Sequence, residues 1–291
     1  MKAASECYLC LLSQVLRTAG VCSLEESKAA ELMRTACGFL AQTDFDRTPP
    51  EISEDLYRLI ASLTGYSDPY EKLKITHIER ALELYPRLKT RVESAADPIR
   101  LALELSLAGN VIDFGANSCE DCFGEEDFLK ASSLAIDHYD LLRKDLNKAE
   151  KILILGDNAG ETVFDRLFIE AIGKPVVYAV REKPIINDAT LKEARLSGLG
   201  DVAEIISSGS TAPGTVPEKS SPEFQKLLKQ ADLIISKGQG NFECLEQVPG
   251  PFYFLLKAKC RVVSRYLQVP QGSLILMRSR NYREKFSFKA V

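Results

Sequence analysis

The sequence predicts an α/β protein in which a three-layer, Rossmann-like, mostly parallel sheet follows an N-terminal all-helical domain. Two observations predict this class. Apolar residues lie at helical spacing up to about residue 147, whereas short apolar runs alternate with helical stretches after Ala149. Such runs are typical of parallel strands that are covered on both faces. We therefore expect a helical domain at 1–147 and an α/β domain at 148–291 that carries the functional site.

Each expected helix of the first half has its own signal. Apolar side chains recur at helical spacing in 7–16 and in 29–40. The segment Thr48-Pro49-Pro50-Glu51 supplies an N-cap, a proline at the first helical position and a capping glutamate, so a helix is expected to begin there. Further helices are expected over 70–94, 98–107 and 134–147, and Gly109 would end the second of these. No stretch of this half alternates like a strand.

Five apolar runs of the second half are expected strands. They cover residues 152–155, 176–180, 202–206, 233–236 and 252–256. The segment 207–222 is rich in Ser, Thr, Gly and Pro, so we expect a long surface loop there and a candidate lid.

Composition limits the classes of function. The chain has 291 residues and a formal net charge of -4, and its Lys and Arg residues form no block, so we expect no nucleic-acid partner. The N-terminus lacks a basic stretch followed by an apolar run, and no segment has the roughly 18 apolar residues that span a bilayer. We expect a cytoplasmic protein without a membrane partner. The sequence does not predict its oligomeric state.

Polar side chains follow three of the expected strands. Asp157 and Asn158 follow the first strand, Lys-Pro-Ile-Ile-Asn-Asp (183–188) follows the second, and Lys-Gly-Gln-Gly-Asn (237–241) follows a later one. Ligands of an open parallel sheet bind outside the carboxyl ends of its strands. We therefore expect two carboxylates, several amides and a lysine to meet at one edge of the sheet.

This set of side chains suits a hard divalent cation and a phosphate. Asp157, Asn158 and Asp188 offer oxygen ligands of the kind that Mg²⁺ or Mn²⁺ prefers. Lys237 would neutralise phosphate oxygens, and Gly160 begins a helix whose first amides would face an anion. A plainer interpretation is also open at two positions, because Asp157 alone would serve as a helix cap and Glu161 would complement the helix dipole.

Three motifs together resemble a known family. Gly-Asp-Asn-Ala-Gly-Glu (156–161), Lys-Pro-Ile-Ile-Asn-Asp-Ala-Thr (183–190) and Ser-Lys-Gly-Gln-Gly-Asn-Phe-Glu (236–243) resemble the damage-control phosphatases, or domain of unknown function 89. Cys7-x-x-Cys10 and Asn110-x-x-Asp113-x-Gly115 are similar to the shorter microbial branch of that family. The resemblance covers nearly the whole chain. It implies a metal-dependent phosphatase that acts on small phosphorylated metabolites such as sugar phosphates, damaged or surplus ones included.

The resemblance also assigns roles by matching position. Asp157, Asn158 and Asp188 would be the catalytic metal ligands, and the metal would be Mn²⁺, Mg²⁺, Co²⁺ or Ni²⁺. The residues expected around the substrate are Lys237, Asn241, Glu161, Asn110 and Gly160. A metal-activated water and a covalent intermediate on Asp157 both stay open as routes for the attack.

Two other classes of function stay open. The first loop, with an acidic residue between Gly156 and Gly160, imitates that of S-adenosylmethionine-dependent methyltransferases, and longer relatives have been described as carboxyl methyltransferases. A noncatalytic metabolite- or zinc-binding protein is the other class, because Cys7-x-x-Cys10 and Cys119-x-x-Cys122 supply four thiolates. Redox pairing or core packing would explain the same cysteines. A dinucleotide-binding dehydrogenase is disfavoured, since the G-x-G-x-x-G spacing is absent.

Overall fold

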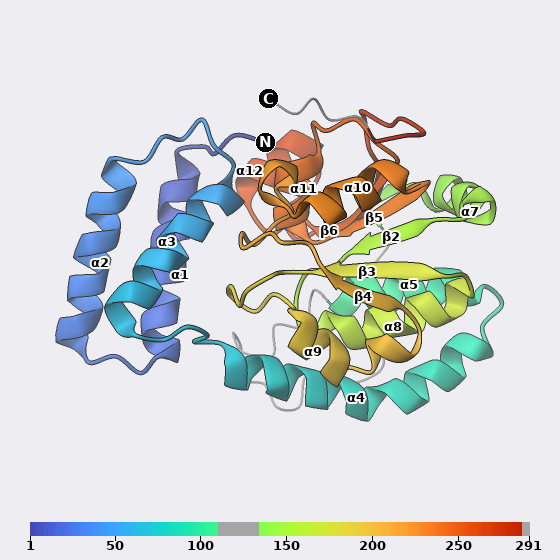
Figure 1. The fold of residues 1–291 in the computed structure, drawn as a ribbon, viewed down its shortest axis with the longest axis horizontal. Helices are drawn as coiled ribbons and strands as arrows, with labels where there is room; N and C mark the ends of the chain where they lie inside the picture. The colour runs from blue at the N-terminus through green and yellow to red at the C-terminus, as the bar shows by residue number, and fades with distance from the viewer. Residues whose placement is uncertain (110–133, 287–291) are drawn as a thin grey trace.

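The computed structural model describes residues 1–109 and 134–286 of the chain. Its centre is a seven-stranded sheet with the strand order β1-β7-β6-β5-β2-β3-β4 (Figure 1). Every neighbouring pair of strands is parallel except β6 and β7, so the prediction of a mostly parallel sheet is confirmed. The strands are β1 (Ile136–Asp137), β2 (Ile152–Leu155), β3 (Val176–Val180), β4 (Glu204–Ser207), β5 (Leu233–Lys237), β6 (Phe252–Lys257) and β7 (Leu274–Arg278).

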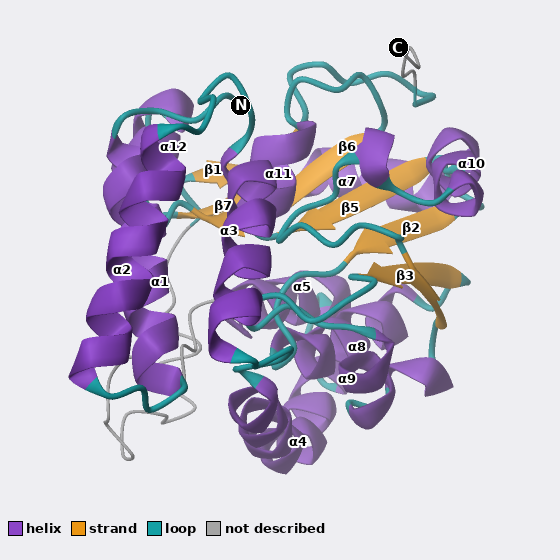
Figure 2. Ribbon diagram, turned by 60° about the vertical axis from the view of Figure 1, so that its left-hand side comes forward, coloured by secondary structure: helices purple, strands orange, loops and turns teal. Residues whose placement is uncertain are grey.

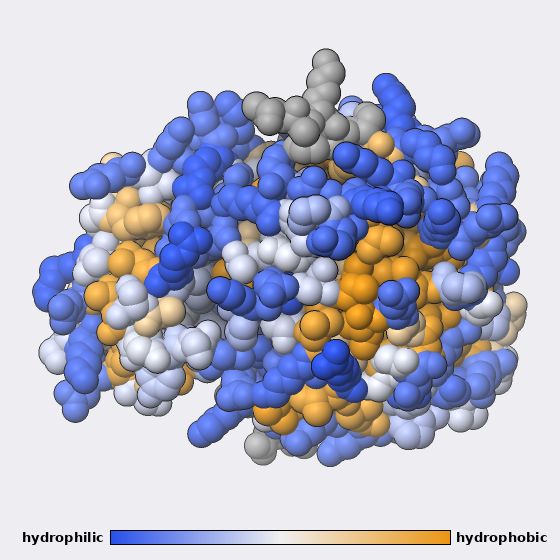
Figure 3. All heavy atoms as spheres, viewed as in Figure 1, coloured by the Kyte–Doolittle hydropathy of each residue, from blue (hydrophilic) through white to orange (hydrophobic). Residues whose placement is uncertain are grey.

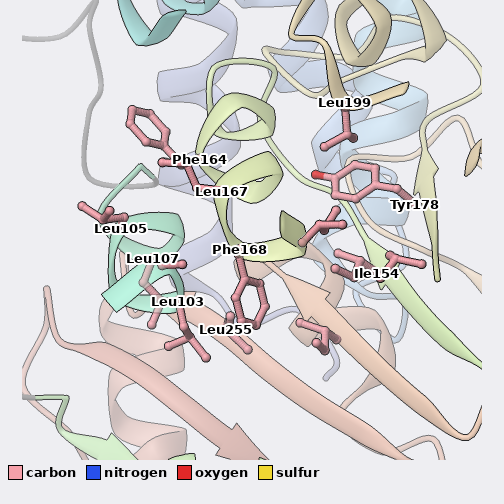
Figure 4. Packing of buried hydrophobic residues seen from close by; sticks show 14 of the residues in the cluster. Leu103, Leu105, Leu107, Ile154, Phe164, Leu167, Phe168, Tyr178, Leu199 and Leu255 are labelled. Atoms are coloured by element: carbon pink, nitrogen blue, oxygen red, sulfur yellow. The ribbon is translucent and has the colours of Figure 1, made fainter. Parts of the chain in front are cut away.

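Helices cover both faces of this sheet, which gives three layers. One face packs against α4 (Glu71–Glu93), α5 (Pro98–Gly109), α7 (Tyr139–Lys148), α8 (Glu161–Ile172) and α9 (Leu191–Leu196). The other face packs against α10 (Pro222–Gln230), α11 (Gln239–Leu245) and α12 (Arg261–Leu267). Each face of the sheet thus has its own hydrophobic core. Along strand β2 the side chains alternate between them: Ile152 and Ile154 belong to the first core, and Leu153 and Leu155 to the second. Figure 4 shows part of the first core, with Phe168 of α8 near Leu103 of α5.

Three N-terminal helices form a separate lobe beside the sheet (Figure 2). They are α1 (Glu6–Val21), α2 (Glu26–Ala41) and α3 (Pro49–Thr64), and they enclose a core of their own. The predicted capping box at the start of α3 is confirmed, since Thr48 and Glu51 cap each other, and Gly65 ends the helix at a φ of 76°. Ile185, from the loop after β3, completes the core of this helical lobe.

Several elements differ from the expectations. Strands β1 and β7 were not predicted, and the helix expected over 134–147 begins only at Tyr139, because Ile136 and Asp137 pair with β7. Helices α4 and α5 belong to the half expected to be a helical domain, yet they share a core with the sheet. The division of the chain near residue 147 therefore stays a prediction.

The expectation of a surface loop at 207–222 is wrong for much of that segment. Ser208, Ser210, Thr215 and Val216 are buried, and a short 3-10 helix, η2, spans Pro217–Lys219. Several of the hydroxyl groups that suggested a loop donate to backbone carbonyls. Ser208 Oγ, for example, donates to the carbonyl of Val180 at 2.9 Å. Among the residues that the structure describes, no helix combines the length and apolar character that a membrane span requires.

Candidate active site

The loops after β2 and β3 are joined by backbone hydrogen bonds. Asn158 and Asp188 form an isolated antiparallel bridge, in which the amide of Ala189 donates to the carbonyl of Asp157 at 2.8 Å. The amide of Ala159 donates to the carbonyl of Asn187 at the same distance, 2.8 Å. The structure thus brings Asp157, Asn158 and Asp188 together at the carboxyl ends of two adjacent strands.

Two carboxylates are buried side by side at this bridge. Asp157 is 7% exposed and Asp188 is 4% exposed. Burial raises the pKa of Asp188 to about 7, the charge of Asp157 adds to the increase, and Arg181 lowers the pKa in part. Two buried like charges with one facing guanidinium favour a further cation at this point.

The amide group of Asn158 is oriented by its neighbours. Its Nδ2 donates to Asp157 Oδ2 at 3.2 Å and to Glu161 Oε1 at 2.5 Å. Because the nitrogen lies between two carboxylate oxygens, the amide oxygen is the atom that remains for a cation. Burial raises the pKa of Glu161 to about 7, although Lys237 lowers it in part. Glu161 is 1% exposed and faces the site rather than solvent.

Lys237, the last residue of β5, is fully buried among oxygen atoms. Its Nζ donates to Asp165 Oδ1 at 2.6 Å, to Glu161 Oε2 at 3.2 Å and to the carbonyl of Ser106 at 3.2 Å. Burial would lower the pKa of Lys237, but the charges of Asp165 and Glu161 outweigh burial and raise it. The lysine therefore stays charged within hydrogen-bonding distance of Glu161.

Asn241 connects three loops of the site. Its Nδ2 donates to the carbonyls of Gly156 at 3.0 Å and Lys237 at 2.7 Å. Its Oδ1 accepts from Arg181 Nη2 at 3.1 Å and from the amide of Thr215 at 2.8 Å. Both ends of this amide already have protein partners, and the expected contact of Asn241 with substrate stays a prediction.

The glycines of the motifs are required by close neighbours. A Cβ at Gly238, whose φ is +80°, would lie 1.9 Å from Asp157 Oδ2. At Gly156 a Cβ would meet the ring of Tyr178 at 2.6 Å. Gly160 is the N-cap of α8, and a Cβ there would meet His77 Cβ at 3.0 Å. The glycines therefore let the loops approach the carboxylates and the core.

The donor atoms of the site fit a hard divalent cation. In 1–109 and 134–286, no group of three or more His, Cys, Asp or Glu side chains is placed to bind a metal ion. The set at the bridge is instead two carboxylates and one amide oxygen, Asp157, Asp188 and Asn158. Mg²⁺ commonly binds through one or two carboxylates and completes its shell with water and phosphate, so this set suits Mg²⁺ or Mn²⁺.

Several of the positions singled out in the sequence lie outside the described residues or are free cysteines. Asn110, Cys119 and Cys122 lie outside the described residues. Cys7 is buried and Cys10 is exposed, both are free thiols, and burial raises the pKa of each. The hypothesis of a four-thiolate zinc site therefore stays a prediction.

The family follows from comparison with known proteins. Residues 3–275 match the family model described as the damage-control phosphatase ARMT1-like domain. The chain belongs to this family. The resemblance inferred from the three loop motifs is thereby confirmed.

Members of the damage-control phosphatase family resemble the chain along almost its whole length. A damage-control phosphatase of Pyrococcus horikoshii is 34% identical over 287 residues, covering 96% of this chain and 99% of the relative. A damage-control phosphatase of Archaeoglobus fulgidus is 32% identical over 285 residues, covering 94% and 98%. The crystal structure of a DUF89 family protein from Pyrococcus horikoshii matches with a TM-score of 0.88 and 33% identity, covering 96% of this chain and 100% of that one.

Four side chains of this family member were missed by sequence reasoning. Asp165, Tyr178 and Arg181 lie in or beside the site but outside the loop motifs, and each is fully buried. Lys259, which follows β6, is exposed, and its charge partly opposes the increase in the pKa of Glu161 and Asp188. The position of Lys259 after the carboxyl end of a strand could have identified it as a site residue from the sequence.

A groove of about 550 Å³ lies at the other end of the strands. It is lined by Leu153, Val176 and Val177 at the amino ends of β2 and β3, and Figure 3 shows an apolar surface in this area. The groove is therefore separate from the bridge between Asn158 and Asp188, where the polar side chains converge.

Proposed function

We propose that the chain is a metal-dependent phosphatase that hydrolyses phosphomonoesters of small metabolites, damaged or surplus sugar phosphates among them. The observation that carries the proposal is the backbone bridge that gathers Asp157, Asn158 and Asp188. The names of two relatives support a phosphatase in metabolite repair. The metal proposed here is Mn²⁺, Mg²⁺, Co²⁺ or Ni²⁺.

The proposed roles follow from the chemistry of each side chain. Asp157, Asp188 and the amide oxygen of Asn158 would hold the cation, which when bound supplies positive charge for the phosphoryl oxygens and lowers the pKa of a bound water. Arg181 holds Asp188 through a 2.8 Å hydrogen bond. Lys259 adds an exposed positive charge that would attract the anionic substrate.

Lys237 places a positive charge beside the proposed ligands. Its ammonium group has three protons, and three protein oxygens accept from it. Direct contact with the substrate phosphate would require exchange of one of the two 3.2 Å contacts, to Glu161 or to Ser106.

A screen of phosphorylated metabolites tests the proposed function. The chelator-treated protein is supplied with each of the four metals and assayed for phosphate release from sugar phosphates and an aryl phosphate. Release with metal supports the proposal. Failure with every substrate and metal, together with metal-independent binding of S-adenosylmethionine in calorimetry, would instead support the methyltransferase alternative.

A further inference from the structure

A chain of hydrogen bonds leads from the buried core to Asn158. Asp165 accepts from Lys237 at 2.6 Å, and Lys237 donates to Glu161 at 3.2 Å. Glu161 in turn accepts from Asn158 Nδ2 at 2.5 Å. We propose that this network (Asp165, Lys237 and Glu161) positions the amide oxygen of Asn158 for the metal ion. The inference rests on the proposed metal-dependent phosphatase activity.

The inner end of the network is held by rigid elements. Asp165 lies on α8 and is 0% exposed. Tyr178 of β3 donates to its Oδ2 at 2.6 Å, and Ser106 of α5 donates to its Oδ1 at 2.5 Å. Figure 4 shows Tyr178 within this core. With Lys237 at the end of β5, four elements of the core fix the carboxylate, so its position does not depend on a surface loop.

The outer end of the network, where Glu161 contacts Asn158, determines which atom of the Asn158 amide faces the metal ion. An asparagine amide can present either its oxygen or its nitrogen to a ligand, and only the oxygen binds a cation. Glu161 Oε1 and Asp157 Oδ2 both accept from Nδ2. Groups behind a metal ligand typically change metal affinity about 10- to 100-fold when they are removed. Asp165, Lys237 and Glu161 are accordingly positioning residues.

Mn²⁺ binding to the whole 291-residue chain, measured by calorimetry with Mn²⁺ alone, tests this proposal. Tyr178→Phe removes the hydroxyl group that donates to Asp165, and Asp165→Asn removes the negative charge of Asp165. Tyr253→Phe is the matched control, because Tyr253 is also fully buried and donates to an aspartate, Asp145, at 2.7 Å. Thermal unfolding is measured for each variant. If Asp165→Asn fails to fold, the milder Tyr178→Phe variant still decides the question.

The proposal predicts that Tyr178→Phe and Asp165→Asn weaken Mn²⁺ binding by about 10-fold or more, whereas Tyr253→Phe leaves it unchanged at a comparable loss of stability. Folded Tyr178→Phe protein with wild-type Mn²⁺ affinity and a raised KM would assign the network to the substrate and overturn the proposal, while the proposed function stands. Wild-type protein that binds no Mn²⁺ and releases no phosphate would overturn both.

Discussion

Arg181 Nε donates a hydrogen bond to Asp188 Oδ2 at 2.8 Å, and both side chains are buried. The same guanidinium donates to Thr215 Oγ1 at 3.1 Å and to Asn241 Oδ1 at 3.1 Å. One cation therefore joins a proposed metal ligand after β3 to the segment before η2 and to α11. The site is held by this buried cation as well as by its own loops.

Removing this cation should destabilise the protein strongly. Arg181→Met leaves the buried carboxylate of Asp188 without its hydrogen-bonded partner, and we expect a loss of about 3 kcal/mol or more in the free energy of unfolding. The control Arg265→Met removes an arginine that is 65% exposed and should cost less than about 0.5 kcal/mol. Urea unfolding of both variants measures the difference. Equal effects would contradict the structural role of Arg181.

Gly238 should be essential for activity for a steric reason. In Gly238→Ala the new Cβ would lie 1.9 Å from Asp157 Oδ2, so we expect phosphatase activity to fall about 100-fold. Gly65 has a similar φ, +76°, but a Cβ added there would meet nothing within 4 Å, so Gly65→Ala tests backbone strain alone. Gly65→Ala should lose about 1 kcal/mol of stability, and Gly238→Ala should lose more, because the contact with Asp157 adds to the backbone strain. Retained activity in Gly238→Ala would contradict the placement of Asp157.

The contact between α3 and the segment 208–221 should depend on pH. Burial alone would raise the pKa of Glu54, but hydrogen bonds from Lys219 and Thr211 outweigh it and lower the pKa below its ordinary value of 4.5. A carboxylate with a lowered folded-state pKa stabilises the fold above its unfolded-state pKa, and that stability is lost as the pH falls through the folded-state pKa.

Glu54→Gln should therefore cost about 1 kcal/mol at neutral pH and less in acid. Unfolding by urea at the two pH values measures the change. In a Lys219→Met background the effect of Glu54→Gln should shrink, because the partner at 2.6 Å is absent. An effect that does not vary with pH would count against this assignment.

The helical lobe should influence the site through Ile185. This side chain is 5% exposed within the core of α1, α2 and α3, three positions before Asp188. Ile185→Ala should cost about 2–5 kcal/mol and also lower activity, because the loop loses its anchor. Leu32→Ala removes a comparable side chain from the same core without touching that loop. If Ile185→Ala and Leu32→Ala lose the same fraction of activity for the same loss of stability, the proposed influence of Ile185 on the site is contradicted.

The sequence was sufficient to predict five of the seven strands and the meeting of Asp157, Asn158 and Asp188. Parallel strands place their carboxyl ends at one edge, so local motifs were enough for this inference. The partners of Lys237 were not predictable, because Asp165 and Ser106 reach it only through the packing of α8 against α5. Such contacts join residues that are distant in sequence and leave no local pattern.

Other features were predicted wrongly or not at all, for different physical reasons. Strand β1 is two residues long, too short to show alternation. Residues 208–217 have the composition of a surface loop, but Ser208 and Ser210 bond to backbone carbonyls and Thr215 accepts from Arg181, which permits burial. Composition alone does not distinguish these two outcomes.

Phosphate release by wild-type, Asp157→Ala and Asp188→Ala protein, measured with chelator and again after Mn²⁺ is restored, tests the central claim most directly. The proposed site predicts that the wild-type protein is inactive with chelator and active with Mn²⁺, and that both variants are inactive in each condition. Asp145→Asn, on α7, is the control and should behave like the wild-type protein. Full activity of either Asp→Ala variant, or of the wild-type protein in chelator, would contradict the assignment.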